Sequence, residues 1–476
     1  MPFNSFEYFL FLTIVVASYW ALPIRWRPHL LLAASYLFYG SRDWRIVLLL
    51  AACTLYTYWL ALAMAGAPRP RRRWLLAASA GVPLAVLFAF KALNILAIGG
   101  PRGALGILTG LDFASSLVPI GLSYYTFQTV AYVVDVYRQD IEPERDLVIY
   151  GTYVAFFPHL LAGPIVRPKR LIPQIASPPR LASTKRFGEG LQLILIGLFK
   201  KVAVADPLLA ACTDSIRPGF TGAATSTPTL LIGTIGCVGA AYFDAAGYVD
   251  MARGSAKLLS IEMQVNFAQP LTRSRCFTYF WRRWQMTLMA WFRDYVYRPI
   301  RNLRGARNET LAIFGTFLIT GLWHGLSMGW LVWGLLTGAA LTFERRAHII
   351  RRTDRALRSA RSPTRRGAVR LGLIGYVLAI LLATMPWVFA DDLGGGLTYY
   401  RSLVSSGLGA PDFNLIAFVV YATVILVLSD RFERSSELMP PGSAIPPMRW
   451  VAFGAMVVGI VIFGGTVGRD FFYVQF

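Results

Sequence analysis

Apolar residues run along most of this chain in long stretches that are separated by short polar segments. Several stretches approach the roughly 20 residues that a helix needs to cross a bilayer. Strands of a membrane β-barrel would instead alternate apolar and polar residues over about 10 residues. The pattern therefore predicts an all-α polytopic membrane protein with about eleven transmembrane helices. The spans are expected at residues 8–23, 46–66, 74–98, 115–135, 187–205, 227–247, 309–322, 327–344, 369–390, 412–429 and 448–466.

Two further apolar segments, residues 29–40 and 148–163, are too short or too interrupted by proline and glycine to cross simply. Such segments are typical of interfacial or re-entrant helices, whose unpaired backbone must be buried in protein or line a cavity. The first span lacks a basic region before it and a small-residue cleavage site after it. We therefore expect a retained helix and not a removable signal peptide.

Basic residues gather between the predicted spans. The formal charge is +22, although only 15% of the residues are charged and 55% are hydrophobic. Arginine-rich loops at residues 69–73, 167–186, 273–307 and 345–370 are expected on the cytoplasmic side. They flank apolar spans and form no recognisable nucleic-acid module, so anionic lipid, and no nucleic acid, is the expected partner. Residues 346–368 are interpreted as a solvated basic loop that connects two helical groups.

Several classes of chemistry lack support in the sequence. The four cysteines, Cys53, Cys212, Cys237 and Cys276, show no CxxC spacing, so we expect no metal site and no disulfide framework. Neither a GxxxxGK[ST] nor a GxGxxG element occurs, which argues against an ATP-driven pump and a nicotinamide enzyme. No internal repeat is evident, which disfavours transporters built from inverted repeats.

The strongest catalytic candidate is His324, which lies in the run Gly321-Leu322-Trp323-His324-Gly325 within an apolar stretch. Ionisable groups at membrane depth are costly, and they often face a cavity and mark function. A histidine can equally donate one N–H to a carbonyl and join two helices. The residue type alone leaves both interpretations open.

Three other polar clusters occur at membrane depth. Ser123, Thr126 and Gln128 are interpreted as groups that join helices by hydrogen bonds. His159 lies in a segment broken by two prolines and a glycine, and it is the second candidate histidine, with a packed role favoured. In the third cluster, Asp244 needs a neutralising partner, for which we expect Arg253 or the arginines from residue 273 onward. One helical face there is formed by Asp244, Gly247, Tyr248 and Met251.

The densest polar and aromatic cluster covers residues 280–297. Arg282, Gln285 and Arg293 lie along one stripe, which predicts an amphipathic helix at or below the cytoplasmic interface. This helix is either an aromatic membrane anchor or a basic rim that receives an anionic acyl donor. The other stripe consists of Trp281, Trp284, Leu288, Trp291, Phe292 and Tyr295.

Five segments in this order resemble the membrane-bound O-acyltransferase superfamily, and within it the bacterial branch that contains the alginate O-acetylation membrane subunit. The chain's opening residues 1–8, residues 35–40 and the ending 470–476 also resemble that branch. The five segments are Pro119–Arg138, Phe156–Arg167, Tyr242–Met251, Phe280–Pro299 and Thr320–Gly338.

The resemblance implies a single integral-membrane domain that surrounds a tunnel. Its parts would be peripheral helices at 1–110, the family's core at 111–345, the basic loop at 346–368 and C-terminal helices at 369–476. An acyl group supplied from the cytoplasm would meet an acceptor from outside. His324 matches the family's invariant histidine, which implies a general base that takes the proton of an acceptor hydroxyl, or a transient acyl carrier.

The resemblance also assigns supporting roles. Related bacterial proteins usually have a second histidine where this chain has Gln285, which forms hydrogen bonds but exchanges no proton at pH 7. Altered donor or acceptor preference is therefore a hypothesis. The expected tunnel residues are Gln285, Trp284, Trp323, Asp294, Tyr295, Asp244, Tyr248 and His159, and the expected donor-binding residues are Arg282, Arg283 and Arg293.

The resulting prediction is an acyltransferase of the bacterial inner membrane that moves an acyl group, expected to be acetyl, to a hydroxyl of an exported polysaccharide or another envelope acceptor. The implied donor is acetyl-CoA, with no bound cofactor, and a periplasmic or extracellular esterase-like protein is a candidate partner. D-alanyl transfer to teichoic acid is the first alternative, because Trp291–Tyr295 also resembles that subunit. A transporter or flippase with His324 and Asp244 on a proton path, and an inactive scaffold, are the others.

Overall fold

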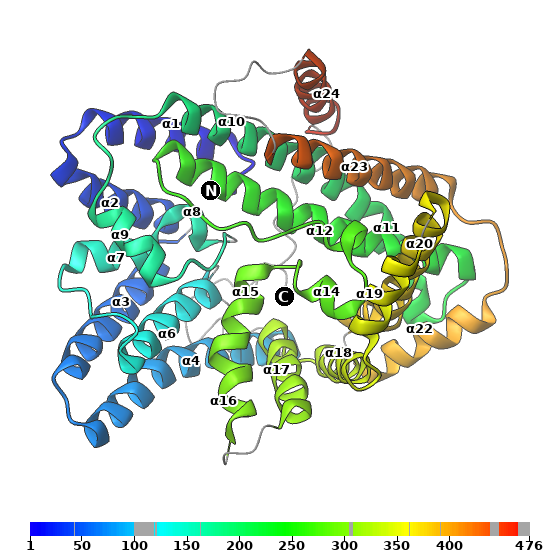
Figure 1. The fold of residues 1–476 in the computed structure, drawn as a ribbon, viewed down its shortest axis with the longest axis horizontal. Helices are drawn as coiled ribbons and strands as arrows, with labels where there is room; N and C mark the ends of the chain where they lie inside the picture. Colours follow the sequence, from blue (N-terminus) through cyan, green and yellow to red (C-terminus); the bar gives the residue numbers. More distant parts are fainter. Residues whose placement is uncertain are drawn as a thin grey trace. The chain divides into compact units, whose positions relative to one another are not determined.

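The computed structural model of the chain describes residues 1–41, 43–99, 119, 121–161, 163–303, 308–360, 362–390, 392–437 and 447–464 (Figure 1). Within these residues the secondary structure is helical and contains no strand. The chain divides into two compact units. Unit 1 comprises Met1–Gly197 and Tyr248–Gln264, and unit 2 comprises Leu198–Gly247 and Val265–Phe472, each within the described residues.

Unit 1 contains the N-terminal helices and the last turns of the long helix α12 (Thr227–Leu258). Side-chain caps fix several of its helix starts. Ser5 accepts a hydrogen bond from the backbone of Tyr8, and Asp146 accepts one from Val148 at 2.7 Å. Its helices are α1 (Phe6–Ala21), η1 (Ile24–Trp26), α2 (Arg27–Gly40), α3 (Trp44–Ala65), α4 (Arg69–Gly99), α6 (Leu122–Arg138), α7 (Leu147–Ala155), α8 (Phe157–Leu160), α9 (Pro168–Ala176) and α10 (Thr184–Leu198).

Buried tyrosines and polar groups join the helices of unit 1. The rings of Tyr132 on α6 and Tyr150 on α7 lie 4.5 Å apart, and the Tyr150 hydroxyl is 2.7 Å from the hydroxyl of Thr57 on α3. Tyr153 on α7 donates to the main-chain oxygen of Gln128 on α6 at 3.1 Å, and its hydroxyl lies 2.8 Å from the Gln128 carboxamide. The expected role of Gln128 as a link between helices is therefore confirmed.

The predicted interruption of segment 148–163 is confirmed. Helix α7 ends before Phe156, and the four-residue helix α8 begins beside Pro158, which has no N–H to continue the preceding helix. The other short segment, residues 29–40, lies in the 14-residue helix α2. The span expected at 115–135 begins as a helix only at Leu122, and its first part lies largely outside the described residues.

A buried arginine closes the α1–α2 corner. Arg27 is 3% exposed, and its guanidinium donates to the main-chain oxygens of Leu22, Pro179 and Arg180. It also lies 4.9 Å from the ring centroid of Tyr19. A buried guanidinium is tolerated when several acceptors receive its N–H groups, so Arg27 fixes the segment before α10 against α1 and α2.

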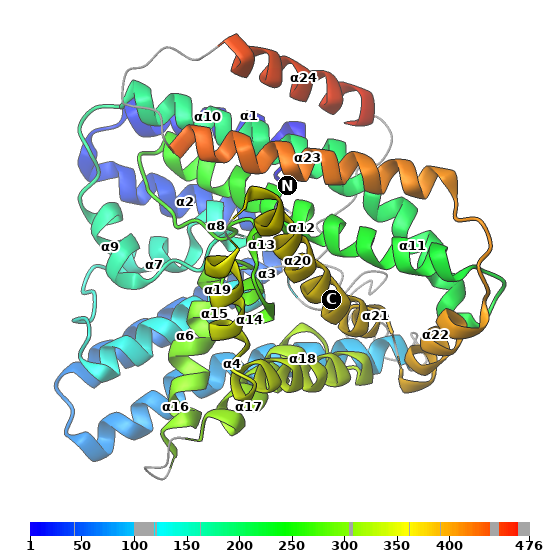
Figure 2. The same ribbon diagram turned by 45° about the vertical axis from the view of Figure 1, so that its right-hand side comes forward.

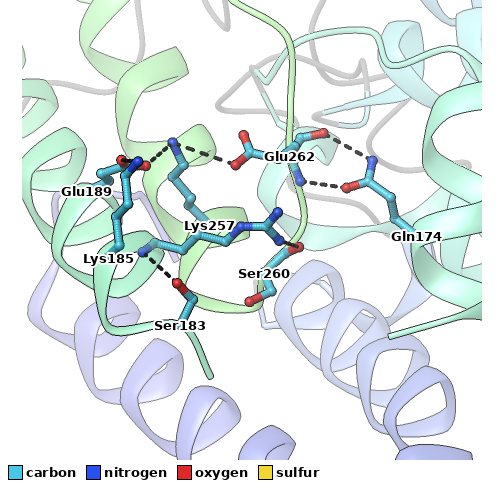
Figure 3. Close-up of polar contacts among 8 residues, drawn as sticks. Gln174, Ser183, Lys185, Glu189, Lys257, Ser260 and Glu262 are labelled. Carbon is cyan, nitrogen blue, oxygen red and sulfur yellow. Dashed lines mark hydrogen bonds and ion pairs between the residues drawn. The ribbon is translucent and has the colours of Figure 1, made fainter. Parts of the chain in front are cut away.

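A surface network connects α9 and α10 with the end of α12, as Figure 3 shows. Lys257 lies 2.6 Å from a carboxylate oxygen of Glu189 and 3.7 Å from one of Glu262. Glu262 also pairs with Gln174, whose side chain accepts from its backbone N–H at 2.8 Å and donates to its carbonyl at 3.2 Å. Exposed ion pairs stabilise little individually, so this network chiefly fixes the path of the chain after α12.

Unit 2 contains the remaining helices (Figure 2). Helix α19 falls within the stretch that was interpreted as a solvated loop at residues 346–368, so part of that stretch is an ordered helix. The helices are η2 (Phe199–Ala205), α11 (Asp206–Thr221), the first part of α12, α13 (Pro270–Arg273), α14 (Phe277–Trp281), α15 (Met286–Phe292), η3 (Arg293–Tyr297), α16 (Arg298–Arg301), α17 (Glu309–His324), α18 (Met328–Arg346), α19 (Ile349–Ser359), α20 (Pro363–Thr384), α21 (Pro386–Phe389), α22 (Leu393–Ser405), α23 (Phe413–Glu437) and α24 (Pro447–Gly464).

Helices α17 and α18 lie side by side in both views (Figures 1 and 2). The buried carboxylate of Glu344 on α18 accepts hydrogen bonds from the backbone N–H groups of Phe277 and Thr278, at 2.6 and 2.7 Å, and from the Thr278 hydroxyl. A carboxylate at a helix N-terminus satisfies amide groups that have no partner within the helix. Glu344 therefore attaches α14 to α18.

The apolar helices agree with a multi-pass membrane protein. Among the described residues four helical segments are long and apolar enough to cross a membrane: Trp44–Ala65, Arg69–Leu93, Thr227–Leu258 and Pro363–Phe389. Shorter apolar helices occur at Phe6–Ala21, Leu147–Leu160, Phe413–Ser429 and Trp450–Gly464. The expected number of about eleven spans stays a prediction.

A buried ionic cluster occupies the junction of η2 and α11 in unit 2. Lys201, which is 0% exposed, lies 2.6 Å from a carboxylate oxygen of Asp244 on α12 and 2.8 Å from one of Asp206. Asp244 thus has the partner that the sequence requires, but the expectation of an arginine was wrong. Arg253 instead pairs with Asp250 one turn away, at 3.4 Å. The π-helical η2 segment carries Lys201, and insertions of this kind displace side chains from the usual helical positions.

We expect Arg27→Met to lower the stability of the protein by about 2 kcal/mol, because three buried carbonyls lose a charged donor. The measurement is the temperature of half-unfolding of the purified protein in detergent. Arg25→Met is the matched control, since Arg25 is exposed and two residues away. Equal shifts in the two variants would contradict the role assigned to Arg27.

Lys201→Met should be far more damaging than Asp244→Asn. The first change leaves two buried carboxylates without their cation, which costs about 3–5 kcal/mol, whereas the second keeps the Lys201–Asp206 pair. The yield of monodisperse membrane-extracted protein and its unfolding temperature measure the difference. A milder effect of Lys201→Met than of Asp244→Asn would show that the lysine does not stabilise this cluster.

Candidate active site around His324

His324 is the last residue of α17 in unit 2. Gly325 adopts extended backbone and ends the helix, and Ser327 then caps α18 by accepting from the N–H of Trp330 at 3.4 Å. The connection between the two helices is therefore short. It brings the first turns of α18 beside the imidazole.

Three indole rings surround the partly buried imidazole. Trp330 stacks on it, with ring centroids 4.5 Å apart and an interplanar angle of 14°. Trp333 meets it edge-on at 5.8 Å, and Trp323 lies at 4.3 Å with an interplanar angle of 51°. Trp323 itself contacts Phe292 of α15 at 6.0 Å. Rotation of the imidazole is thus restricted on several sides.

Two glycines of the histidine motif make this packing sterically feasible. A Cβ atom at Gly325 would lie 2.4 Å from Cδ1 of Trp330, and one at Gly321 would lie 2.4 Å from the Trp330 carbonyl oxygen. Real Cβ atoms do not approach other heavy atoms so closely. The glycines around His324 are therefore needed for close contact between α17 and α18.

Aromatic contacts extend from His324 to the turn that carries Gln285. Trp333 contacts Trp281 of α14 at 5.8 Å, and the neighbouring Phe280 stacks on Trp284 at 5.3 Å. Trp284 is 8% exposed and Gln285 is 6% exposed. The predicted tunnel residues Trp284, Gln285 and Trp323 are thus connected with His324 through packed rings of one unit.

The expectation of one continuous amphipathic helix over residues 280–297 was wrong. Helix α14 ends at Trp281, and Gln285 adopts left-handed backbone with φ 41° and ψ 55° before α15 begins. For a residue other than glycine this conformation costs about 1–2 kcal/mol and persists only where its surroundings impose it.

The surrounding segment that imposes this turn is residues 266–268. The N–H of Met286 donates to the Asn266 carbonyl at 2.8 Å, and the N–H of Thr287 donates to Asn266 Oδ1 at 2.9 Å. On the other side, the N–H of Ala268 donates to the Arg283 carbonyl at 3.0 Å. Sequence reasoning missed Asn266, because a polar residue 21 positions away from its partner gives no periodic signal. It also missed Lys201, although two adjacent lysines in an apolar segment could have drawn attention to it.

The predicted donor-binding arginines have different environments. Arg282 is exposed and its guanidinium carbon lies 5.5 Å from the Tyr279 ring, whereas Arg283 donates to the Ala268 carbonyl at 3.1 Å. Arg293 forms two hydrogen bonds with the carboxylate of Asp294, at 2.9 and 3.1 Å. These bonds raise the pKa of the Arg293 guanidinium. Binding of a donor by these arginines stays a prediction.

Asp294 and Tyr295 lie in η3, one turn after α15. The Asp294 carboxylate also pairs with Arg298 at 3.1 Å, and the Tyr295 ring contacts Trp291 at 5.3 Å. The carboxylate therefore lies between two exposed guanidinium groups. This arrangement places an ordered basic patch on the same helical segment as Trp291.

The remaining predicted site residues occupy other places. His159 and Tyr248 belong to unit 1, whereas His324 belongs to unit 2. His159 is 1% exposed and its ring lies 5.7 Å from that of Phe156, and Tyr248 contacts the ring of Phe3 at 5.7 Å. Asp244 lies in the Lys201 cluster described above. Their participation in a tunnel stays a prediction.

The arrangement around His324 suits proton transfer. An imidazole can accept a proton near neutral pH, and indole walls exclude water from its faces. Within the part of the chain that the structure describes, no three His, Cys, Asp or Glu side chains gather closely enough to hold a metal ion.

Comparisons with known proteins agree with this geometry. A family model described as MBOAT, membrane-bound O-acyltransferase family, matches residues 143–374, which include His324 and Gln285. The chain is 35% identical over 421 residues to a protein of Pseudomonas putida named "Probable alginate O-acetylase AlgI", and the match covers 86% of this chain and 81% of that protein.

More distant similarity extends to two other proteins. The chain is 29% identical over 321 residues to the peptidoglycan O-acetyltransferase of Helicobacter pylori, covering 60% of this chain and 57% of that protein. It is 29% identical over 240 residues to the teichoic acid D-alanyltransferase of Streptococcus thermophilus, covering 47% and 55%. The extensive match to the Pseudomonas protein and the family model give one conclusion: this chain is a multi-pass membrane protein that belongs to the membrane-bound O-acyltransferase family.

Proposed function

We propose that this protein transfers an acetyl group to a hydroxyl of an exported polysaccharide. The observation that carries the proposal is the imidazole of His324, which is held by Trp330 at the end of α17 and lies in the region that matches the family model. The names of the Pseudomonas and Helicobacter relatives, which describe O-acetylation of alginate and of peptidoglycan, support acetyl as the group and a glycan as the acceptor.

In the proposed reaction His324 is the general base. Its unprotonated ring nitrogen accepts the proton of the acceptor hydroxyl while that oxygen attacks the carbonyl carbon of an acetyl thioester. The C–O bond forms, the C–S bond breaks, and the leaving thiolate is protonated by the imidazolium. Stacking on Trp330 keeps the ring in one orientation throughout, and Gln285 contributes hydrogen bonds but no proton.

The donor proposed for this reaction is acetyl-CoA from the cytoplasm, and the proposed location is the bacterial inner membrane. The arginine-rich segments support a cytoplasmic side on which an anionic donor would arrive. An extracytoplasmic esterase-like protein is proposed to receive the acetyl group or to present the glycan. D-alanyl transfer is the second candidate, supported by the Streptococcus relative, but that match covers only 47% of this chain.

His324→Ala should reduce acetyl turnover by about 100-fold or more, because a positioned general base contributes that much to the rate. The purified chain in lipid nanodiscs is given radiolabelled acetyl-CoA, and release and transfer of the label are followed. His348→Asn is the matched control: His348 is an exposed histidine of the same unit with φ 53°, which asparagine tolerates. Undiminished turnover in His324→Ala would end the proposal.

Gln285→His should change donor preference or rate, because it introduces a second group that titrates near neutral pH. Competing acetyl, propionyl and D-alanyl thioesters, each supplied to the native chain and the variant, measure the preference. If both the preference and the rate stay unchanged, the glutamine does not tune the reaction.

A further inference from the structure

Asn266 caps a helix to which it does not belong. Helix α15 begins at Met286, and its own N-cap residue, Gln285, makes no side-chain cap. Asn266 Oδ1 takes that role by accepting from the N–H of Thr287 at 2.9 Å and from the Thr287 hydroxyl at 2.8 Å. Since an N-cap side chain normally bonds to these amides, the cap from Asn266 leaves the Gln285 carboxamide available for another use.

The same asparagine fixes the backbone on the C-terminal side of Gln285. Its carbonyl accepts from the N–H of Met286 at 2.8 Å. Two residues before Gln285, Arg283 is bonded to Ala268 in both directions, at 3.0 and 3.1 Å. One short segment therefore holds both ends of the left-handed turn.

Asn266 is 4% exposed, and the groups around it belong to the same aromatic cluster as His324. The ring of the adjacent Phe267 meets Trp284 edge-on at 5.3 Å, and Trp284 directly precedes Gln285. A displacement of segment 266–268 would therefore move Trp284 and Gln285 together.

We propose that Asn266 is a positioning residue, which imposes the left-handed turn at Gln285 so that the carboxamide is held for acyl transfer at His324. This inference rests on the proposed function. Asn266 itself touches no reacting atom. It acts through the two residues that follow Gln285, and its loss lowers the rate by letting the carboxamide leave its position.

The test is a double-mutant cycle on the full chain in nanodiscs with radiolabelled acetyl-CoA. Asn266→Ala should lower kcat by about 10- to 100-fold, because small displacements of a catalytic group have effects of this size. Asn266→Asp keeps the Oδ1 acceptor and should restore kcat to within about threefold of the native value. Gln285→Asn keeps a residue that tolerates left-handed backbone but withdraws the carboxamide by one methylene.

In the Gln285→Asn background, Asn266→Ala should cause little additional loss, because the carboxamide that Asn266 positions is already displaced. Losses that multiply in the double variant would overturn the inference and leave a merely structural asparagine. So would an unchanged kcat in Asn266→Ala. Asp392→Ala is the matched control, since Asp392 caps α22 in the same unit by accepting from Gly395 at 2.7 Å. If it lowers kcat as much as Asn266→Ala, a general loss of stability explains both.

Thr287→Val carries the test if Asn266→Ala does not fold. This change removes the hydroxyl donor to Asn266 and keeps the backbone donor, so a smaller loss of kcat is expected that disappears beside Gln285→Asn. His324→Ala separates the two proposals. Turnover that survives in His324→Ala, or is absent from the native chain, ends the proposed function and this inference with it. Turnover that requires His324 but not Asn266 ends this inference alone.

Discussion

The stacking of His324 on Trp330 is the interaction on which the candidate site depends. It requires the close contact of α17 and α18, and that contact requires the absence of side chains at Gly321 and Gly325. The imidazole is in turn connected through Trp333 and Trp281 with α14. Orientation of the histidine is thus a property of packed rings and not of a single hydrogen bond.

Polar groups in the helical bundle follow a second constraint, because water is scarce at membrane depth and partners must come from the protein. Lys201 is paired with two carboxylates, and Glu344 accepts three hydrogen bonds from the start of α14. These contacts join helices that are distant in the sequence. They also place α14, and therefore the rings next to His324, in a fixed position on α18.

The segment between α14 and α15 shows how a functional group can be exposed to a site by a local exception. A continuous helix would be the cheaper local structure, yet hydrogen bonds from Asn266 and Ala268 impose a left-handed turn at Gln285. Such exceptions to local preference concentrate where function requires a defined geometry. In this family member a carboxamide occupies the turn, close to the histidine in the network of aromatic contacts.

Local patterns predicted the helical class, the positions of most apolar helices, the break at Pro158 and the family, because each depends on neighbouring residues. They also selected His324 as the candidate, although its role stays a prediction. The partner of Asp244 and the turn at Gln285 could not be predicted in this way. Lys201 and Asn266 reach these positions only when the chain folds, and which polar groups meet in a membrane bundle is decided by helix packing, for which residue spacing carries no signal.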